Sequence, residues 1–494
     1  MSQGADPMAV REPSLTDALV PLVLLTVLIA GSLSLFGLDA LDGPIQVAMF
    51  VCCAVVALIA MKNGHEFHAV EESSRGALAS VSSAIFILLA VGALIGVWNL
   101  SGTIPTLVYY GIQILSPGWF YAATALICGL VALSIGSSWT TAATIGVGLV
   151  GIAGLIGASP EITAGAVVSG AYLGDKTSPL SETTVLTAQM VGADVHEHIK
   201  RQVWTSAPAF GIAFVVFFVL GLTTGDTVPS AETTSDLDEL NQIFNITPLA
   251  LLPLLLLGYL SIRKVPAYLA LLASTVFAGV LGAFLQPDVY ADFVSGTGNV
   301  VVESFKAIWL AMANGFSISS GIPDVDRLLS RGGMDSMLLT IWLIFGAVAF
   351  GAMLEEFGMI ARLVAPLFAM ARSTGRLFVA VFVCGFGLNV VAGDQYIALV
   401  LPTKIFRAEF ARRGLAPTNL SRLAADCGTV TSPLVPWNSC GAFMAATLGV
   451  ATLLYLPYAV FCYASPALSV LYGFTGFRIE KVELTDHGHT EATA

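Results

Sequence analysis

The stretch Gly174-Asp175-Lys176-Thr177-Ser178-Pro179-Leu180-Ser181-Glu182-Thr183-Thr184 places acids, a base, hydroxyls and a proline inside a segment apolar enough to cross a bilayer. Its centre recurs as Thr431-Ser432-Pro433-Leu434, 254 residues after Thr177. Proline removes a backbone donor and clashes with the preceding turn, so a helix cannot run regularly through either copy. Broken backbone at membrane depth is tolerated only inside protein or beside a wet cavity. The two copies therefore predict one ion-binding site built by two halves of the chain.

The composition is that of a polytopic membrane protein. Of the 494 residues, 56% are hydrophobic and 11% are charged, and the mean hydropathy is +0.84. Soluble domains average about 45–50% apolar and 25% charged residues. The net charge of −12 argues against nucleic acid as a partner, because nucleic acid calls for basic patches. The seven cysteines have no paired CxxC or histidine spacing, so the sequence suggests neither a disulfide framework nor a zinc site. No cofactor is expected, and Na⁺ and H⁺ are expected as transported ions.

Apolar runs and loop charges set the expected topology. A spanning helix needs about 20 apolar residues. Ordinary spans are expected at residues 18–36, 45–61, 81–98, 205–223, 247–262, 265–285, 338–354 and 454–474. The loop after the second span carries Lys62 and Arg75, whereas the loop before it has no basic residue, so the positive-inside rule places both termini in the cytoplasm. The acidic loop at 224–246 is then external, and the protein is a multi-pass protein of the cell inner (cytoplasmic) membrane.

Each half of the chain also predicts a hairpin and an interrupted helix. In the first half, residues 119–157 form a hairpin around Gly136-Ser137-Ser138-Trp139, and residues 162–195 form a broken helix. In the second half, the hairpin is 377–403 around Asp394-Gln395, and the broken helix is 423–449. Basic residues flank only the second hairpin, so the two halves enter the membrane from opposite sides.

Inverted repeats with discontinuous helices are typical of secondary transporters. The expected fold is therefore an all-α polytopic membrane protein with about ten transmembrane helices, two re-entrant helical hairpins and two discontinuous helices in inverted repeats. The expected parts are an N-terminal tail with two helices (1–77), a first repeat (78–202), linking helices (203–337), a second repeat (338–452), and a last helix with a cytoplasmic tail (453–494). Residues 286–337 give no clear pattern.

Several of these segments resemble the NhaC-type sodium/proton antiporter family. The resemblance is carried by Ser169 to Thr184, by Asp394-Gln395-Tyr396, by the segments at 413–417 and 419–422, and by Cys427 to Gly441. The sequence departs from the family pattern at Glu182, where the family usually has Asp, and at Ser137, which stands at a threonine position. The resemblance covers residues 78–472. It implies an inverted-repeat transporter, a homodimer, that exchanges external protons for internal sodium.

Sodium is a hard cation and prefers oxygen ligands, which both interrupted segments supply. A bare carboxylate in a low-dielectric path costs several kcal/mol, so the carrier changes sides readily only when a proton or a cation neutralises that charge. If H⁺ and Na⁺ compete for one carboxylate, exchange follows. We expect Asp175 and Asp394 to be the exchanging carboxylates and Na⁺ ligands, with Glu182 a further ligand or proton site. Lys176 is expected either to pair with a carboxylate when sodium leaves or to serve in a structural ion pair.

Further oxygen atoms are expected to support the ion. The supporting ligands predicted from the sequence are Ser137, Ser138, Thr177, Ser178, Thr183, Gln395, Thr429, Thr431, Ser432 and Asn438. Hydroxyl and amide groups in membrane helices often only bridge helices or bond to their own backbone, so the Thr-Ser-Pro-Leu residues are expected mainly to shape the breaks. Among cations, Li⁺ is a further candidate beside Na⁺.

Two other functions remain open at this level. A sodium- or proton-coupled exchanger of small organic anions such as malate and lactate would use the same fold, with Lys176 and the helix N-termini holding a carboxylate. An intramembrane enzyme is disfavoured, because the chain has neither an HExxH nor a GxSxG motif. Uptake of labelled carboxylates against a sodium gradient separates the first alternative from cation exchange.

Overall fold

The computed structural model describes residues 10–115, 117–223, 240–295, 298–318, 325–326 and 329–482. Within these ranges the chain is helical, and the extended structure consists of two isolated bridge pairs, Phe316 with Arg331 and Leu415 with Lys481. Most of the acidic loop expected outside the membrane, and the two tails before residue 10 and after 482, lie outside the described residues. The prediction of an all-helical polytopic membrane protein is confirmed.

Two sets of helices follow the same order along the chain. The first set is α4 (Ser82–Leu100), α5 (Thr103–Ile114), α6 (Phe120–Ile135), α7 (Ser138–Thr141), the π-helix η3 (Ala142–Gly146), α8 (Val147–Leu155), α9 (Pro160–Thr177), α10 (Glu182–Val191) and α11 (Val195–Thr223). The second set is α18 (Leu338–Glu356), α19 (Met359–Met370), α20 (Thr374–Val391), α21 (Gln395–Arg412), α22 (Pro417–Ala424), the π-helix η6 (Ala425–Thr429), η7 (Ser432–Leu434), α23 (Ser439–Leu448), α24 (Thr452–Tyr455), η8 (Leu456–Tyr458) and α25 (Val460–Thr475).

The spacing between the two sets is constant at the hairpins and the breaks. Helices α21, α22 and α23 begin 257 residues after α7, α9 and α10. The turns repeat as well, because Gly136 and Gly393 at the hairpin tips have positive φ values of 78° and 61°. Only glycine adopts this left-handed conformation without strain. The two sets are therefore copies of one structural unit, which the sequence predicted from its hairpins and interrupted helices.

The Thr-Ser-Pro-Leu copies are offset by 254 residues rather than 257. Leu180 is followed directly by Ser181, the N-cap of α10, whereas the three residues 435–437 separate Leu434 from Asn438, the N-cap of α23. The chain from the first residue of α22 to Thr431 is three residues shorter than the chain from the first residue of α9 to Thr177, and it contains the π-helix η6. The motif therefore lies at a different place within the second break than within the first.

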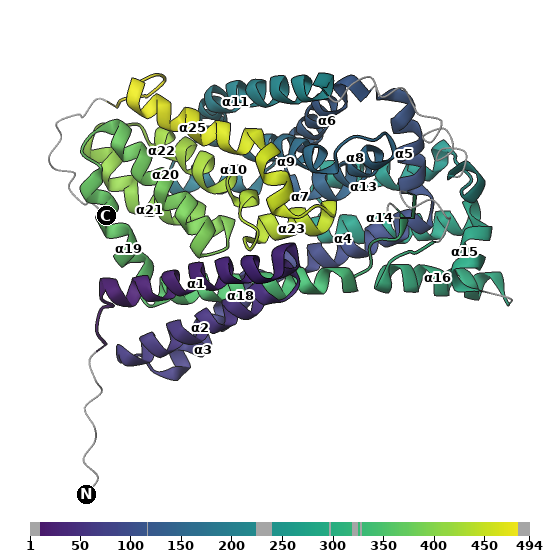
Figure 1. Ribbon diagram of the computed structural model, residues 1–494. Helices are drawn as coiled ribbons and strands as arrows, with labels where there is room; N and C mark the ends of the chain where they lie inside the picture. The colour runs from purple at the N-terminus through teal and green to yellow at the C-terminus, as the bar shows by residue number, and fades with distance from the viewer. Residues whose placement is uncertain are drawn as a thin grey trace, which may run out of the picture.

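The remaining helices flank these two sets. They are α1 (Leu15–Phe36), η1 (Gly37–Asp42), α2 (Pro44–Lys62), α3 (Phe67–Ser80), η2 (Pro117–Trp119), η4 (Pro248–Leu251), α13 (Leu252–Ile262), α14 (Ala267–Leu285), α15 (Pro287–Val294), α16 (Val300–Asn314) and η5 (Asp335–Met337). Figure 1 shows α1, α2, α3 and α18 as one layer below α9, α10, α20 and α25. The region without a clear sequence pattern, 286–337, contains α15 and α16.

Eight helices of the described chain are long and apolar enough to cross a membrane, or nine if the bent pair at Ser439–Leu448 and Thr452–Tyr458 counts as one span. Two of the eight, Ser138–Leu155 and Thr374–Val391, are arms of the expected hairpins. Shorter apolar helices include Pro248–Ile262 and Val460–Thr475. The second hairpin differs from its prediction, because its returning arm α21 extends to Arg412 rather than residue 403. The helix continues through a polar surface segment that hydropathy does not mark.

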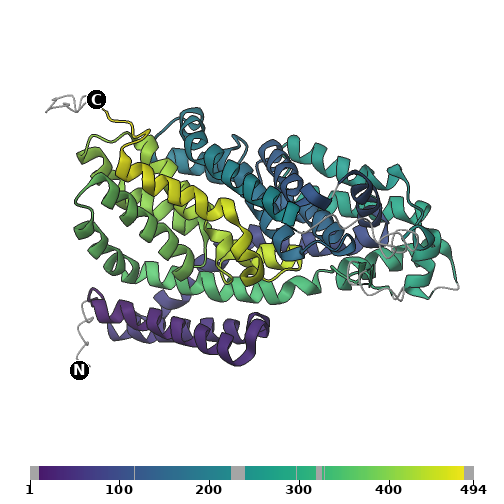
Figure 2. The ribbon, with the colours of Figure 1, turned by 45° about the horizontal axis from the view of Figure 1, so that its top comes forward.

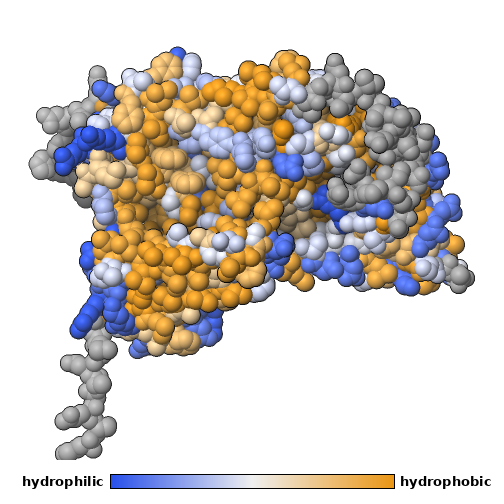
Figure 3. Space-filling view, in the orientation of Figure 1, coloured by the Kyte–Doolittle hydropathy of each residue, from blue (hydrophilic) through white to orange (hydrophobic). Residues whose placement is uncertain are grey.

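Helix α1 begins, and α25 ends, at the same end of the molecule (Figures 1 and 2). That end is rich in arginine, with Arg372, Arg376, Arg412 and Arg413 at the ends of α19, α20 and α21, and we call it the basic end. Figure 3 shows hydrophobic side chains over the middle of the visible face and hydrophilic ones at its two sides. This distribution is expected of a protein whose middle band contacts lipid.

Candidate functional site

The candidate site lies at the break between α9 and α10. Ser181 caps α10 through its hydroxyl, and Ser178 fixes the break by donating a hydrogen bond from Oγ to the Leu133 carbonyl oxygen at 2.8 Å. The Asp175 side chain, two residues before the end of α9, is buried with 7% of its surface exposed. The break therefore holds a carboxyl group inside the protein, as the sequence predicted.

Three hydroxyl groups donate hydrogen bonds to the Asp175 carboxylate. Ser138 Oγ, at the tip of the first hairpin, bonds Oδ2 at 2.7 Å. From beyond the break, Ser181 Oγ and Thr183 Oγ1 bond Oδ1 at 2.7 Å and 3.1 Å. Thr184 Oγ1 donates to the Asp175 backbone carbonyl oxygen at 2.9 Å. The hydroxyls around the carboxylate thus come from the hairpin tip and from the far side of the break, where α10 begins.

The second repeat forms a matching but uncharged cluster. Gln395, at the tip of the second hairpin, accepts hydrogen bonds on Oε1 from Ser432 Oγ at 3.0 Å and from Cys440 Sγ at 2.7 Å. Ser138 and Gln395 are 257 residues apart, and so are Asp175 and Ser432. The same contact between hairpin tip and break occurs in both repeats, with the acceptor on the break in the first and on the hairpin tip in the second.

The two clusters face each other across the repeats. Tyr396 Oη, on the second hairpin, donates to Glu182 Oε2 of the first break at 3.2 Å. The Asp175 charge acts on both Tyr396 and Cys440. Near the first hairpin tip, the Trp139 ring stacks on Phe443 of α23 with centroids 4.0 Å apart. The tips and breaks of both repeats therefore converge on one place, which only the tertiary structure could show.

This arrangement of hydroxyl groups allows the Asp175 carboxylate to bind either a proton or a small cation. A hydroxyl group donates one hydrogen bond and also has lone pairs to offer. When the carboxylate is bare, the hydroxyls of Ser138, Ser181 and Thr183 stabilise it as donors, which is the geometry observed. When a small hard cation binds, the same hydroxyls can rotate and present oxygen to it. A neutral oxygen set around one carboxylate is thus able to exchange a proton for a monovalent cation.

Lys176 points to a different partner from its neighbour in the sequence. Its ammonium group forms an ion pair with Asp426 of η6, and both side chains have no exposed surface. The ammonium also donates to Ser465 Oγ at 2.7 Å and Thr205 Oγ1 at 3.1 Å. Lys176 is therefore ion-paired with Asp426, a residue outside the predicted ligand set, and its role in ion exchange stays a prediction.

Asp394 and Glu182 lie outside the hydroxyl cluster of Asp175. Asp394 is the N-cap of α21, its Oδ1 accepts from the Ile397 amide at 3.0 Å, and 8% of its surface is exposed. The Glu355 charge acts on it from the end of α18. Glu182 is exposed and bonds Tyr396. The structure therefore does not place Asp394 in the hydroxyl cluster that surrounds Asp175, and its role as an exchanging carboxylate stays a prediction.

Several predicted supporting ligands make other bonds. Thr177 Oγ1 bonds the Leu173 carbonyl oxygen at 2.6 Å, and Thr431 Oγ1 bonds that of Cys427, each one turn earlier on the same chain. The remaining predicted groups are used as follows: Ser178 bonds Leu133, Ser137 caps α7, Asn438 caps α23 and bonds Asn389, and Thr429 offers its carbonyl oxygen to Ser432. Thr177, Thr431, Ser178 and Ser137 thus bond backbone atoms, whereas the buried Thr429 hydroxyl has no partner, and the role of these groups as ion ligands stays a prediction.

Some residues of the site were missed or undervalued by sequence reasoning. Cys440 and Asn389 were not singled out, although each contacts a predicted residue, Gln395 and Asn438. Thr205 and Ser465 were not predicted as site residues, because each lies in an apolar segment that was expected to be an ordinary span. A polar residue on an otherwise apolar helix is a weak signal, because such residues are common bridges between membrane helices. Their convergence on Lys176 depends on how α11 and α25 pack.

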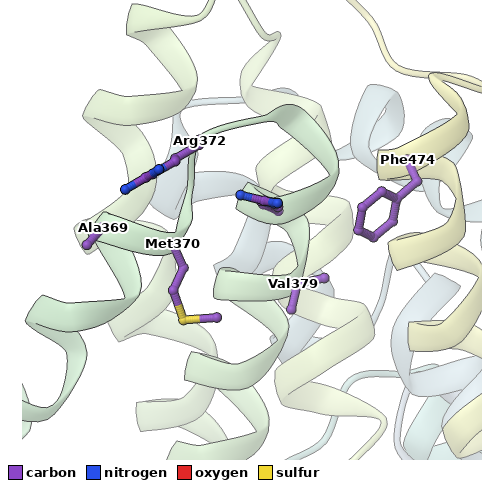
Figure 4. Close-up of a pocket in the computed structure, with 6 residues that line it drawn as sticks. Ala369, Met370, Arg372, Val379 and Phe474 are labelled. Atoms are coloured by element: carbon purple, nitrogen blue, oxygen red, sulfur yellow. The ribbon is translucent and has the colours of Figure 1, made fainter.

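A cavity of about 420 Å³ lies elsewhere, at the basic end. Figure 4 shows Ala369, Met370, Arg372, Val379 and Phe474 around it, contributed by the ends of α19 and α25, the segment between α19 and α20, and α20 itself. Its lining does not include the residues of the hairpin tips or the breaks. The carboxylate site is therefore a polar cluster inside the packed chain rather than this open cavity.

The chain is similar to known proteins over most of its length. The family model described as "Na+/H+ antiporter family" matches residues 20–206 and 201–477. The Na(+)/H(+) antiporter NhaC of Alkalihalophilus pseudofirmus is 36% identical over 436 residues, which is 88% of this chain and 91% of that protein. The malate-2H(+)/Na(+)-lactate antiporter of Bacillus subtilis is 32% identical, covering 94% of this chain and 96% of that protein. The solved structure of Neisseria gonorrhoeae MtrF is similar with a TM-score of 0.39 at 14% identity, covering 94% of this chain and 96% of that chain.

Proposed function

Because the chain belongs to the Na⁺/H⁺ antiporter family, we propose that it exchanges the two ions at Asp175, where H⁺ and Na⁺ compete for one buried carboxylate. The observation that carries this proposal is the ring of three hydroxyl donors around a carboxylate with 7% exposure. The oxygens of Ser138, Ser181 and Thr183 supply neutral ligands, so a bound Na⁺ leaves the site without net charge.

Charge then enforces the exchange. An unneutralised carboxylate moving through the low-dielectric part of the protein costs several kcal/mol. The conformational change is therefore fast with Na⁺ or H⁺ bound and slow with the carboxylate bare. Alternating access to the two sides converts a gradient of one ion into a gradient of the other. Asp394 is proposed as a second exchanging carboxylate, and Glu182 as a ligand or proton site on the path to Asp175.

The orientation and assembly complete the proposal. We place the basic end in the cytoplasm of the inner membrane, because positively charged residues are retained on that side. Sodium is then exported and protons enter. The protein is proposed to act as a homodimer in the lipid bilayer, which size-exclusion chromatography with light scattering would test.

The decisive experiment uses purified protein in lipid vesicles with a pH-sensitive dye. Sodium added outside is expected to dissipate an imposed pH gradient in the wild type, and Asp175→Asn is expected to abolish this response. Asp39→Asn is the matched control, because Asp39 is an exposed aspartate in η1 far from the breaks in sequence. Normal exchange by Asp175→Asn would refute the assignment of Asp175.

A second candidate function is exchange of small organic anions. It is favoured by the similarity to the malate/lactate antiporter and by a 33% identical relative named arginine/ornithine antiporter ArcD, from Halobacterium salinarum. The same vesicles, tested with Na⁺, Li⁺, K⁺, malate and lactate, separate the two functions. A response to sodium without a response to the organic anions supports cation exchange, and the reverse pattern supports the second candidate.

A further inference from the structure

Asp175 and Lys176 are adjacent, oppositely charged and buried, yet each is bonded to other groups. Side chains of consecutive residues on an α-helix point about 100° apart, since one turn takes 3.6 residues. Asp175 is directed to the hydroxyls of the first hairpin tip and of α10. Lys176 is directed to the second repeat and to α11 and α25. The end of α9 thus separates a carboxylate from an ammonium group that would otherwise neutralise it.

Each of the three N–H donors of the Lys176 ammonium group has a hydrogen-bond acceptor. An ammonium group has three N–H donors. In the structure these reach Asp426 Oδ1, Ser465 Oγ at 2.7 Å and Thr205 Oγ1 at 3.1 Å. Ser465 Oγ in turn donates to the same Asp426 oxygen at 2.5 Å. The charge pair is therefore held by hydroxyls from two further helices, α11 and α25.

Asp426 is presented by the π-helix η6 in the second repeat, and other charged or titratable groups surround the pair. Arg422, one turn earlier, acts electrostatically on both Asp426 and Lys176. The Lys176 charge acts on His198 of α11, whose ring nitrogens contact Ser421 and Gln202, and the Phe461 ring of α25 lies 5.8 Å from Nζ. Asp426 is thus an anion among cations, and its removal would leave the Lys176 ammonium without its charged partner.

The nearest other carboxylate in the sequence is Asp175. Opposite charges attract strongly where the dielectric constant is low, and the lysine stem is long and flexible. We propose that Asp426 is a positioning residue that holds the Lys176 ammonium away from Asp175, so that the Asp175 carboxylate stays free for Na⁺ or H⁺. Without this hold, Lys176 acts as an internal cation that competes with sodium. This inference rests on the proposed role of Asp175.

The test measures sodium binding to the purified full-length protein by isothermal titration calorimetry, with choline as the control cation. Asp426→Asn is expected to weaken sodium binding about a hundredfold, the scale of one close charge pair in protein. The double variant Lys176→Gln with Asp426→Asn is expected to restore the affinity to within about threefold, because it removes the competing cation together with its partner. If Asp426 only stabilises the fold, the double variant is expected to bind sodium as weakly as Asp426→Asn does.

If the Asp426→Asn protein does not fold, Ser465→Ala tests the same inference while the Asp426 carboxylate stays in place. It removes one of the three groups that hold the ammonium, and it is expected to weaken sodium binding in a way that Lys176→Gln reverses. Ser469→Ala, one turn further along α25 and equally buried, is the matched control and is expected to bind sodium normally.

The possible outcomes distinguish this inference from the proposed function. Normal sodium affinity in Asp426→Asn, or a double variant as weak as the single one, overturns the positioning role of Asp426. Normal sodium affinity in Asp175→Asn overturns the proposed site itself, whatever the Asp426 variants do. Loss of binding in Asp175→Asn together with rescue by Lys176→Gln supports both.

Discussion

At the scale of single residues, the site depends on which way each hydroxyl group is directed. Ser138 and Thr177 both lie near Asp175 in the fold or the sequence, but only Ser138 bonds its carboxylate. Thr177 bonds the backbone of its own helix at Leu173. Residue type alone does not distinguish an ion ligand from a hydroxyl that hydrogen-bonds to the backbone at the end of a helix. Among the predicted ligands, this distinction separates those that contact the Asp175 carboxylate from those that contact the backbone.

We expect Ser138→Ala to weaken sodium binding by about 1–2 kcal/mol, roughly five- to thirtyfold, because a hydrogen bond to a charged group is lost together with one oxygen ligand. Thr177→Val is the control and is expected to leave the affinity within about twofold, since its hydroxyl bonds only a helix carbonyl. Calorimetric titration with sodium measures both. Equal losses in the two variants would argue against the hydroxyl ring as the ion site.

At the scale of elements, the break is supported by close packing of α9 against α6. A Cβ atom on Gly174 would lie 2.3 Å from the Cβ atom of Ala132, and one on Gly170 would lie 2.3 Å from the Ala125 carbonyl oxygen. Small residues at four-residue spacing let two membrane helices approach closely. The first hairpin arm and the first broken helix are thus fixed to each other, which sets the distance between Ser138 and Asp175.

Gly174→Ala is expected to lower the stability by about 1–3 kcal/mol, because the added methyl group overpacks a backbone contact. Gly154→Ala in α8 is the matched control, because nothing lies within 4 Å of its added Cβ atom. The Gly154→Ala substitution is expected to leave the stability of the protein unchanged or to raise it by about 0.4–1 kcal/mol. Thermal unfolding in detergent measures the difference. A Gly174→Ala protein as stable as the control would refute this packing.

At the scale of the whole molecule, the two repeats differ in charge although they share one plan. Where the hairpin tips and the breaks converge, the first repeat contributes Asp175, and the second contributes Gln395, Ser432 and Cys440. One carboxylate surrounded by neutral groups allows one cation or one proton at a time. With Asp175 as the proposed exchange site, H⁺ and Na⁺ would compete for it, and the sodium affinity is then expected to depend on pH.

We expect the sodium concentration for half-maximal exchange to rise as the pH falls, by about tenfold per pH unit where protonation of a single carboxylate dominates. The maximal rate at saturating sodium is expected to change much less. Exchange rates in vesicles at several pH values, with the same pH on both sides, measure this dependence. A half-maximal concentration that does not vary with pH would show that the two ions do not compete.

The sequence by itself determined the class of protein and its doubled plan, and it singled out Asp175, which is buried. Hydropathy is a local property, and a helix that crosses a membrane needs enough apolar residues whatever surrounds it. The breaks at residues 178–181 and 430–438 could likewise be predicted, because proline and clustered polar groups interrupt a helix by local chemistry. Asp175 stood out because a buried ionisable residue in a membrane is expensive and therefore functional by default.

Only the tertiary structure decided how these parts meet. The partner of Lys176 is 250 residues away and lies on a π-helix, whose irregular winding a periodic pattern does not reveal. The same holds for Ser465 and Thr205, which join the pair from separate helices. The Thr-Ser-Pro-Leu copies are identical in sequence, yet one leads directly into the N-cap of α10 and the other lies three residues further from the N-cap of α23. Contacts between distant segments depend on packing, and that is why the ligand set could be predicted only in part.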